Sequence, residues 1–158
     1  MTASGGRAAA ALEILAIDHV GIAVPDLDAA IEFHTGVLGG VVTHRESNEE
    51  QGVEEAMISF DDGAQIQLLS PLTAESTIAK FLDRNGAGVQ QLAYTVDDIE
   101  TTSAELRAKG LRLLYEKAKI GTSDSRVNFV HPKDAGGVLI ELVEPAQPAR
   151  PAQPEEGA

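Results

Sequence analysis

The chain contains no cysteine and no tryptophan, and aromatic residues make up only 4% of it. The absence of cysteine excludes disulfides, thiolate metal sites and cysteine nucleophiles, and is typical of a protein from a reducing compartment. With so few aromatic side chains, the core has to be built from Val, Ile, Leu and Ala. A chain of 158 residues is long enough for one such core.

Positive charge is also scarce, since the chain has 12 Lys and Arg residues but 25 Asp and Glu residues, for a formal net charge of −13. Binding to nucleic acid requires a basic face, so this balance argues against a nucleic-acid partner. It leaves room for a small anionic substrate held by a local group of basic residues. No apolar run is long enough to cross a bilayer, and Glu13 interrupts the run nearest the start, so we expect no membrane partner and a cytoplasmic location.

Both ends of the sequence differ in composition from the middle. We expect residues 1–14 to form a flexible segment, and the Pro- and Ala-rich residues 146–158 to form a disordered tail. Residues 15–145 are then a single domain.

Inside this domain one pattern occurs twice, in "IDHVGIAVPDLDAAIEFHTGVLGG" and in "VQQLAYTVDDIETTSAELRAKGLR". Each copy begins with an alternating strand, after which Asp26 or Asp98 is placed to cap a helix. Each copy ends in a second alternating strand, "AQIQLLSP" or "GVLIELVEP", that a proline terminates. The sequence therefore predicts an α+β fold with two tandem modules, at about residues 15–71 and 88–145, joined by a helical linker over residues 72–87.

The strands place four polar residues at equivalent points of the two copies, because successive side chains of a strand point to opposite faces. His19 matches Gln91 near the start of each copy, and Gln67 matches Glu141 near its end. All four lie on the face away from the helices. Taken singly, each could be an ordinary hydrogen-bonded or half-exposed residue. Together, an imidazole nitrogen with amide and carboxylate oxygens is also a suitable set of ligands for a divalent metal.

These motifs resemble the vicinal oxygen chelate superfamily, to which glyoxalases, bleomycin-resistance proteins and dioxygenases belong. Within it, "NEEQGVEEAMISF", "ESTIAKFL", "LLYEKAKIGTSDS" and "RVNFVHPKDAGGVLIELVEP", in this order, are similar to the methylmalonyl-CoA epimerase family. The resemblance spans about residues 17–145. It implies two βαβββ modules that form a cupped mixed sheet around a metal site, in a homodimer.

The resemblance also implies roles for particular residues. The metal ligands fall on His19, Gln67, Gln91 and Glu141, and would hold one divalent ion per subunit, Co²⁺ or Mn²⁺ in preference to Ni²⁺, Mg²⁺ or Zn²⁺. At Gln91 the family commonly has a histidine, which is a stronger donor than an amide oxygen. Glu55 falls on the position of the catalytic base, and Glu141 is the second candidate.

Epimerisation of methylmalonyl-CoA removes the proton at C2 and returns one to the opposite face, which calls for two acid–base groups and stabilisation of an enolate. The acyl-CoA substrate also carries phosphates. Four basic residues lie close together in the sequence, near His131, and are candidates to bind them: Lys117, Lys119, Arg126 and Lys133.

Other functions are also compatible with these residues. A glyoxalase I-type lyase uses a similar ligand set on a glutathione hemithioacetal, whereas an extradiol dioxygenase needs two histidines and is disfavoured by Gln91. An antibiotic-sequestering protein of the same fold would need neither metal nor Glu55. A catalytically inactive relative is the fourth possibility.

Overall fold

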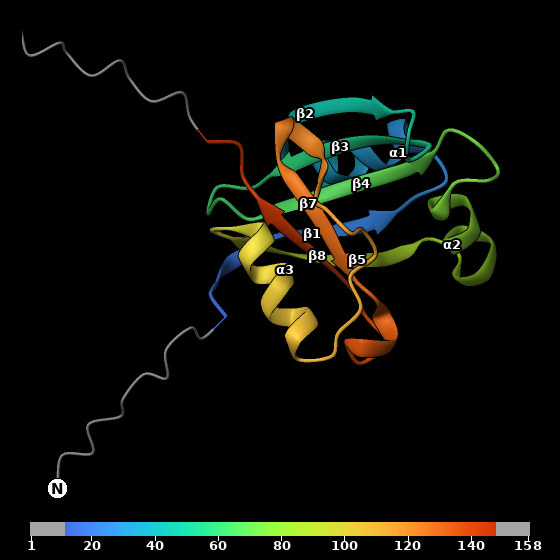
Figure 1. The fold of residues 1–158 in the computed structure, drawn as a ribbon. Coiled ribbons are helices and arrows are strands. Elements are labelled where there is room, and N and C mark those ends of the chain that lie inside the picture. Colours follow the sequence, from blue (N-terminus) through green and yellow to red (C-terminus); the bar gives the residue numbers. More distant parts are fainter. Residues whose placement is uncertain (1–11, 148–158) are drawn as a thin grey trace, which may run out of the picture.

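The computed structural model describes residues 12–147, and Figure 1 shows their fold. The flexible segment and disordered tail expected at the two ends lie almost entirely outside these residues. Within residues 12–147 no helix is long and apolar enough to cross a membrane.

The first module consists of a strand, a helix and three further strands: β1 (Ile14–Ala23), α1 (Leu27–Glu32), β2 (Val41–Asn48), β3 (Val53–Ser59) and β4 (Gln65–Pro71). A π-helical turn, Phe33–Val37, extends α1. The helix α2 (Thr77–Asn85) lies within the predicted linker. The second module repeats the order: β5 (Gly88–Val96), α3 (Ile99–Ala108), β6 (Lys119–Ile120), β7 (Arg126–Val130) and β8 (Leu139–Glu144). Short 3-10 turns, Thr122–Asp124 and Pro132–Asp134, lie before and after β7.

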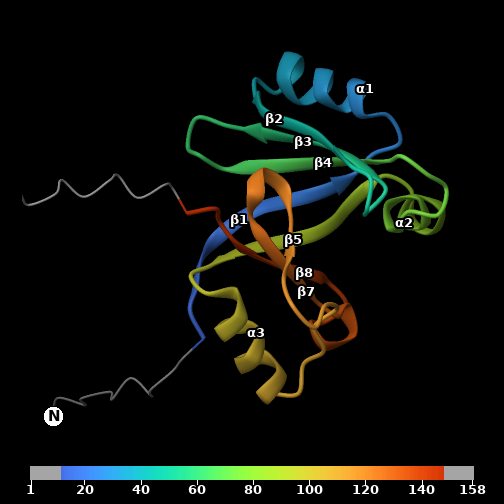
Figure 2. The same ribbon diagram turned by 45° about the horizontal axis from the view of Figure 1, so that its top comes forward.

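The eight strands form one mixed sheet in the order β2-β3-β4-β1-β5-β8-β7-β6. The modules meet at the antiparallel pair β1 and β5, and inside each module the first strand is parallel to the last. Figure 2 shows that the sheet is strongly curved, with α1 outside one half and α3 outside the other. The predicted α+β fold of two βαβββ modules with a cupped mixed sheet is thus confirmed.

The predicted helix caps explain where the helices begin. Asp26 Oδ1 accepts a hydrogen bond from the backbone N–H of Ala29, and Asp98 Oδ1 accepts one from Thr101, both at 3.1 Å. Each carboxylate satisfies one of the N–H groups that the first helical turn leaves free. Beyond Glu32 the first helix widens into the π-helical turn, which ends just before the glycines at 39 and 40.

Each helix buries one apolar stripe against the outer face of its own half of the sheet. Leu27 of α1 packs in a cluster with Val24, Ile58 and Leu68, and α3 forms the matching cluster of the second module. Because the helices occupy the convex face, the residues that alternate with the core residues line the inside of the cup.

Candidate active site

The four polar residues singled out by the repeat meet at the centre of the cup. His19, Gln67, Gln91 and Glu141 come from β1, β4, β5 and β8, and each is only 4–6% exposed. His19 Nε2 lies 3.1 Å from Glu141 Oε2, and Gln91 Nε2 donates to Glu141 Oε2 at 2.6 Å and to Gln67 Oε1 at 3.1 Å. Residues from four strands and both modules therefore form one contiguous polar cluster.

Small residues on the two central strands make this convergence possible. Gly21 is the register partner of both Gln67 and Gln91. A Cβ atom at Gly21 would lie 2.4 Å from Cγ of Gln91, which real Cβ atoms do not tolerate. In the second module Ala93 stands opposite both His19 and Glu141. A glycine or alanine beside each long polar side chain gives it room to reach the centre.

The orientation of the His19 ring is fixed by its neighbour in the sequence. Nδ1 of His19 lies 2.7 Å from Asp18 Oδ1, and Thr95 donates a hydrogen bond to the other Asp18 oxygen at 2.9 Å. Burial lowers the pKa of His19, but the hydrogen bonds and charges of Asp18 and Glu141 outweigh it and raise that pKa to about 9. A cation that binds Nε2 must therefore displace a proton.

Gln67 links the polar cluster to Glu55. Its Nε2 donates to Glu55 Oε2 at 2.9 Å and to Thr122 Oγ1 at 3.0 Å, which leaves its Oε1 directed at Gln91. The Thr122 hydroxyl donates to the other oxygen of Glu55. Glu55 is thus a buried carboxylate held by two donors next to the cluster.

The surroundings of Glu55 change its acidity. Burial raises the pKa of Glu55, the Thr122 hydrogen bond lowers it, and Glu46 and Glu141 raise it further, so that it stands at about 7. A carboxyl group with a pKa near neutrality exchanges a proton readily in both directions, as a general acid–base group must.

The cluster has the chemistry of a cation site. Three atoms that could bind a cation, Nε2 of His19 once deprotonated, Oε1 of Gln67 and Oε2 of Glu141, lie within 3.5 Å of one nitrogen, Nε2 of Gln91. As a ligand Gln91 would offer its oxygen instead. Nowhere in residues 12–147 do three or more His, Cys, Asp or Glu side chains form a group able to hold a metal. The cluster contains only two residues of those types, so it needs the two amides, and a hard or borderline divalent ion fits this set.

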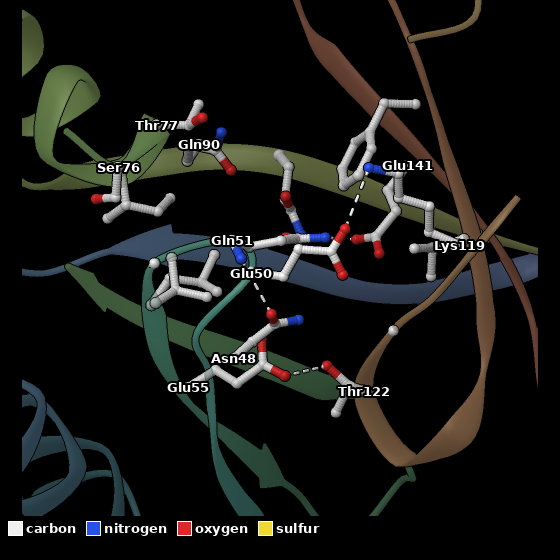
Figure 3. A pocket seen from close by; sticks show the side chains of 18 of the residues that line it. Asn48, Glu50, Gln51, Glu55, Ser76, Thr77, Gln90, Lys119, Thr122 and Glu141 are labelled. Carbon is white, nitrogen blue, oxygen red and sulfur yellow. Dashed lines mark hydrogen bonds and ion pairs between the residues drawn. The ribbon is translucent and has the colours of Figure 1, made fainter. Parts of the chain in front are cut away.

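A cavity of about 430 Å³ opens beside the cluster. Glu55, Gln67, Gln91 and Glu141 line its inner wall, while the β2–β3 loop and the start of α2 form its rim. Figure 3 shows Glu55 with Thr122 on one side of the cavity, and Gln90 with Ser76 and Thr77 on another. A second cavity, of about 300 Å³, reaches His19, Glu141 and Thr122 from the other end of the cup.

The four phosphate candidates do not gather in one place. Only Lys119 lines the main cavity, where its Nζ lies 3.4 Å from Glu50 and 4.3 Å from the ring centre of Tyr115. Arg126 forms ion pairs with Glu100 and Glu144 instead. Lys117 and Lys133 line neither of the two cavities.

Sequence reasoning missed three residues of the site. Asp18 directly precedes His19, and that adjacency was a usable signal. Thr122 lies in the loop "GTSDS", and its hydroxyl contacts Glu55 and Gln67. Regular strand alternation would turn Gln90 away from the site, because it is adjacent to Gln91 in β5. It lines the main cavity instead, since the pairing of β1 with β5 is irregular at that point.

Comparisons with known proteins find relatives that are similar over most of this chain. The model of the "Glyoxalase/Bleomycin resistance protein/Dioxygenase superfamily" matches residues 18–129. The crystal structure of methylmalonyl-CoA epimerase from Mycobacterium tuberculosis is similar at 54% identity and a TM-score of 0.84, over 87% of this chain and 93% of that one. A methylmalonyl-CoA epimerase in complex with methylmalonyl-CoA and NH4+ is similar at 44% identity and a TM-score of 0.81, over 85% and 96%. The mitochondrial methylmalonyl-CoA epimerase of Homo sapiens is 40% identical over 80% of this chain and 72% of its own.

Proposed function

The chain belongs to the glyoxalase/bleomycin resistance/dioxygenase superfamily, and we propose that it is a methylmalonyl-CoA epimerase that interconverts the 2R and 2S forms of its substrate. One observation carries the proposal. A buried carboxylate, Glu55, is held by Thr122 and Gln67 directly beside a cluster of cation ligands. The relatives at 40–54% identity are named for this reaction.

His19, Gln67, Gln91 and Glu141 would hold one divalent metal ion per subunit, with Co²⁺ or Mn²⁺ preferred. Such an ion supplies a Lewis acid that stabilises negative charge on the oxygens of the thioester and the carboxylate. The protein contributes the arrangement of the ligands. Asp18 orients the imidazole, and the two hydrogen bonds donated by Gln67 Nε2 direct Gln67 Oε1 toward the cluster.

Glu55 is proposed to take the proton from C2 on one face of the substrate and to return it in the reverse direction. Its pKa of about 7 leaves a substantial fraction ionised, and therefore basic, at neutral pH. Thr122 and Gln67 each donate to one of its oxygens, which holds the carboxylate in place on the wall of the cavity.

Glu141, in its protonated form, is proposed to deliver a proton to C2 from the opposite face and, once ionised, to take one in the reverse direction. It lines the same cavity from the other module, and its Oε2 takes part in the cluster. A carboxylate that also binds a cation is a weaker base, so the two directions of the reaction use groups of unequal strength.

The homodimer and the cytoplasmic location that the resemblance and composition led us to expect remain predictions.

The function is tested by proton exchange at C2 of methylmalonyl-CoA in heavy water, followed by NMR, with metal-stripped protein and with protein reloaded with Co²⁺ or Mn²⁺. We expect exchange in the reloaded samples and little in the stripped one. A glutathione hemithioacetal, assayed in parallel with the same samples, tests the glyoxalase reading. Turnover of the hemithioacetal without exchange of the C2 proton of methylmalonyl-CoA would show that the protein is a lyase and not an epimerase. Full exchange after metal stripping would show that the reaction does not need the metal, but it would still support the epimerase reaction.

A further inference from the structure

Gln90 lies at an irregularity in the centre of the sheet. On β1 the consecutive residues Gly21 and Ile22 pair with Gln91 and Val89, so the pairing steps over Gln90. Such a β-bulge places two residues of one strand opposite one of the other and re-aims a side chain that regular alternation would turn away. Gln90 and Gln91 both line the main cavity as a result, although they are adjacent in the strand.

The Gln90 side chain has an unused hydrogen-bonding group. Its Oε1 is buried and accepts no hydrogen bond, and it is one of only three such side-chain atoms in residues 12–147. The other two, on His44 and Ser103, do not line the main cavity. Leaving a buried acceptor unpaired is unfavourable. A group that enters the cavity and supplies a donor would therefore gain an interaction there.

The position of Gln90 within the cavity indicates what that group is. Gln90 lies on the same side of the cavity as Ser76 and Thr77, at the start of α2, away from Glu55 and Thr122, where the acyl group is proposed to react (Figure 3). The remainder of an acyl-CoA must leave the reaction centre along another wall of the cavity. Its first part is a flexible arm that contains two secondary amides, each with one N–H donor and one carbonyl acceptor.

We propose that the side-chain amide of Gln90 binds an amide of the thioester arm of the acyl-CoA substrate. A primary amide both donates and accepts, as does the amide of the arm, so the two groups match in either orientation of the Gln90 head. The contact gives Gln90 a role in selecting the arm, distinct from the role of Gln91 in holding a cation. It rests on the proposed function only in that the substrate is an acyl-CoA.

The experiment removes the amide from each partner in turn. The protein variants are Gln90→Met, which keeps the length of the side chain without hydrogen bonding, and Gln90→Ala. The substrates are the N-acetylcysteamine thioester of methylmalonic acid, which has one amide, and an S-alkyl thioester of equal length without it. Gln65→Met, the same change on β4 outside the main cavity, is the control.

For the wild type we expect kcat/KM to be about tenfold higher for the amide thioester than for the alkyl thioester, since an unpaired buried amide is costly. In both Gln90 variants this preference should disappear, while the rate with the alkyl thioester stays the same. A preference that persists in both variants, or a loss that is equal for both thioesters, would overturn the inference.

Binding of propionyl-CoA, measured by calorimetry, tests the same contact without turnover. This ligand has the complete arm but lacks the carboxylate at C2. We expect about tenfold weaker binding to Gln90→Met and unchanged binding to Gln65→Met. Unchanged binding to Gln90→Met would contradict the contact even if the enzyme epimerises methylmalonyl-CoA. A wild type that binds propionyl-CoA through Gln90 but exchanges no C2 proton would contradict only the proposed function.

Discussion

The two modules supply side chains at equivalent positions to the polar cluster but differ one strand further out. On β3, Glu55 lies two residues before the register partner of Gln67, and on β7, Val127 lies two residues before the register partner of Glu141. Glu55 and Val127 are therefore equivalent positions of the duplicated unit, and both are buried, at 6% and 2% exposure. One module places a carboxylate where the other places an apolar side chain.

The difference continues on the next strand. Glu46 of β2 pairs with Glu55, and Lys119 of β6 pairs with Val127. The first module thus places two carboxylates side by side, and burial together with Glu46 raises the pKa of Glu55, while the second offers an apolar wall with a lysine at its rim. Duplication accounts for the proposed cation ligands, and divergence of the outer strands would separate the proposed proton transfer from substrate binding.

Removal of the carboxylate from the first module should have the largest effect. Glu55→Gln keeps the shape of the side chain but cannot take a proton, so we expect kcat for C2 exchange to fall by about 10²–10⁴-fold with KM little changed. Glu54→Gln, on the opposite face of β3 and paired with Arg45, is the control and should retain activity. Exchange at full rate in Glu55→Gln would mean that the asymmetry between Glu55 and Val127 has no catalytic role.

The same carboxylate should also make folding depend on pH. Glu55 has a pKa of about 7 in the folded protein against 4.5 ordinarily, so protonation favours the folded state. The stabilisation is complete below pH 4.5 and is lost as the pH rises through 7, by up to about 3 kcal/mol. His19 adds a loss of the same sign at higher pH, because its pKa is raised to about 9.

Urea unfolding of metal-free protein between pH 4.5 and 8 measures this effect, with Glu55→Gln as the reference that removes only the Glu55 contribution. We expect the wild type to lose stability relative to Glu55→Gln up to about pH 7 and to run parallel to it above. Parallel curves over the whole range would contradict the raised pKa.

These contrasts also indicate what the sequence was able to reveal. Helix caps at Asp26 and Asp98, and the equivalence of His19 with Gln91, follow from local spacing, and the structure contains the caps and brings the two side chains together. Two features of the site did not follow from the spacing of residues in the sequence. Alternation assumes a regular ladder, so the bulge at Gln90 was invisible, and the Thr122 contact depends on how a loop distant in sequence folds over Glu55.

The equivalent pair His19 and Gln91 leads to a smaller effect, on metal affinity. Gln91→Ala removes one proposed ligand and should weaken Co²⁺ or Mn²⁺ binding by at least about tenfold, and His19→Ala should weaken it more because imidazole is the stronger donor. Gln91→His, which makes the two modules alike, should strengthen binding of Co²⁺. Titration followed by calorimetry measures all three, with Gln90→Ala as the control. Equal losses in Gln90→Ala and Gln91→Ala would show that the cation is not held by the residue equivalent to His19.

The smallest effect concerns Lys119, the basic counterpart of Glu46. It is the only one of the four phosphate candidates on the main cavity, and its side chain is 45% exposed. An exposed charge contact contributes about 0.2–1 kcal/mol, so Lys119→Gln should raise KM for methylmalonyl-CoA by no more than about fivefold without changing kcat. Lys133→Gln should leave KM unchanged, since Lys133 lies beyond the far end of β7. Added salt should reduce the difference in KM between the wild type and Lys119→Gln, because it screens exposed charges. A larger effect at Lys133 than at Lys119 would place the phosphates outside the cavity and would separate substrate binding from the contrast between β2 and β6.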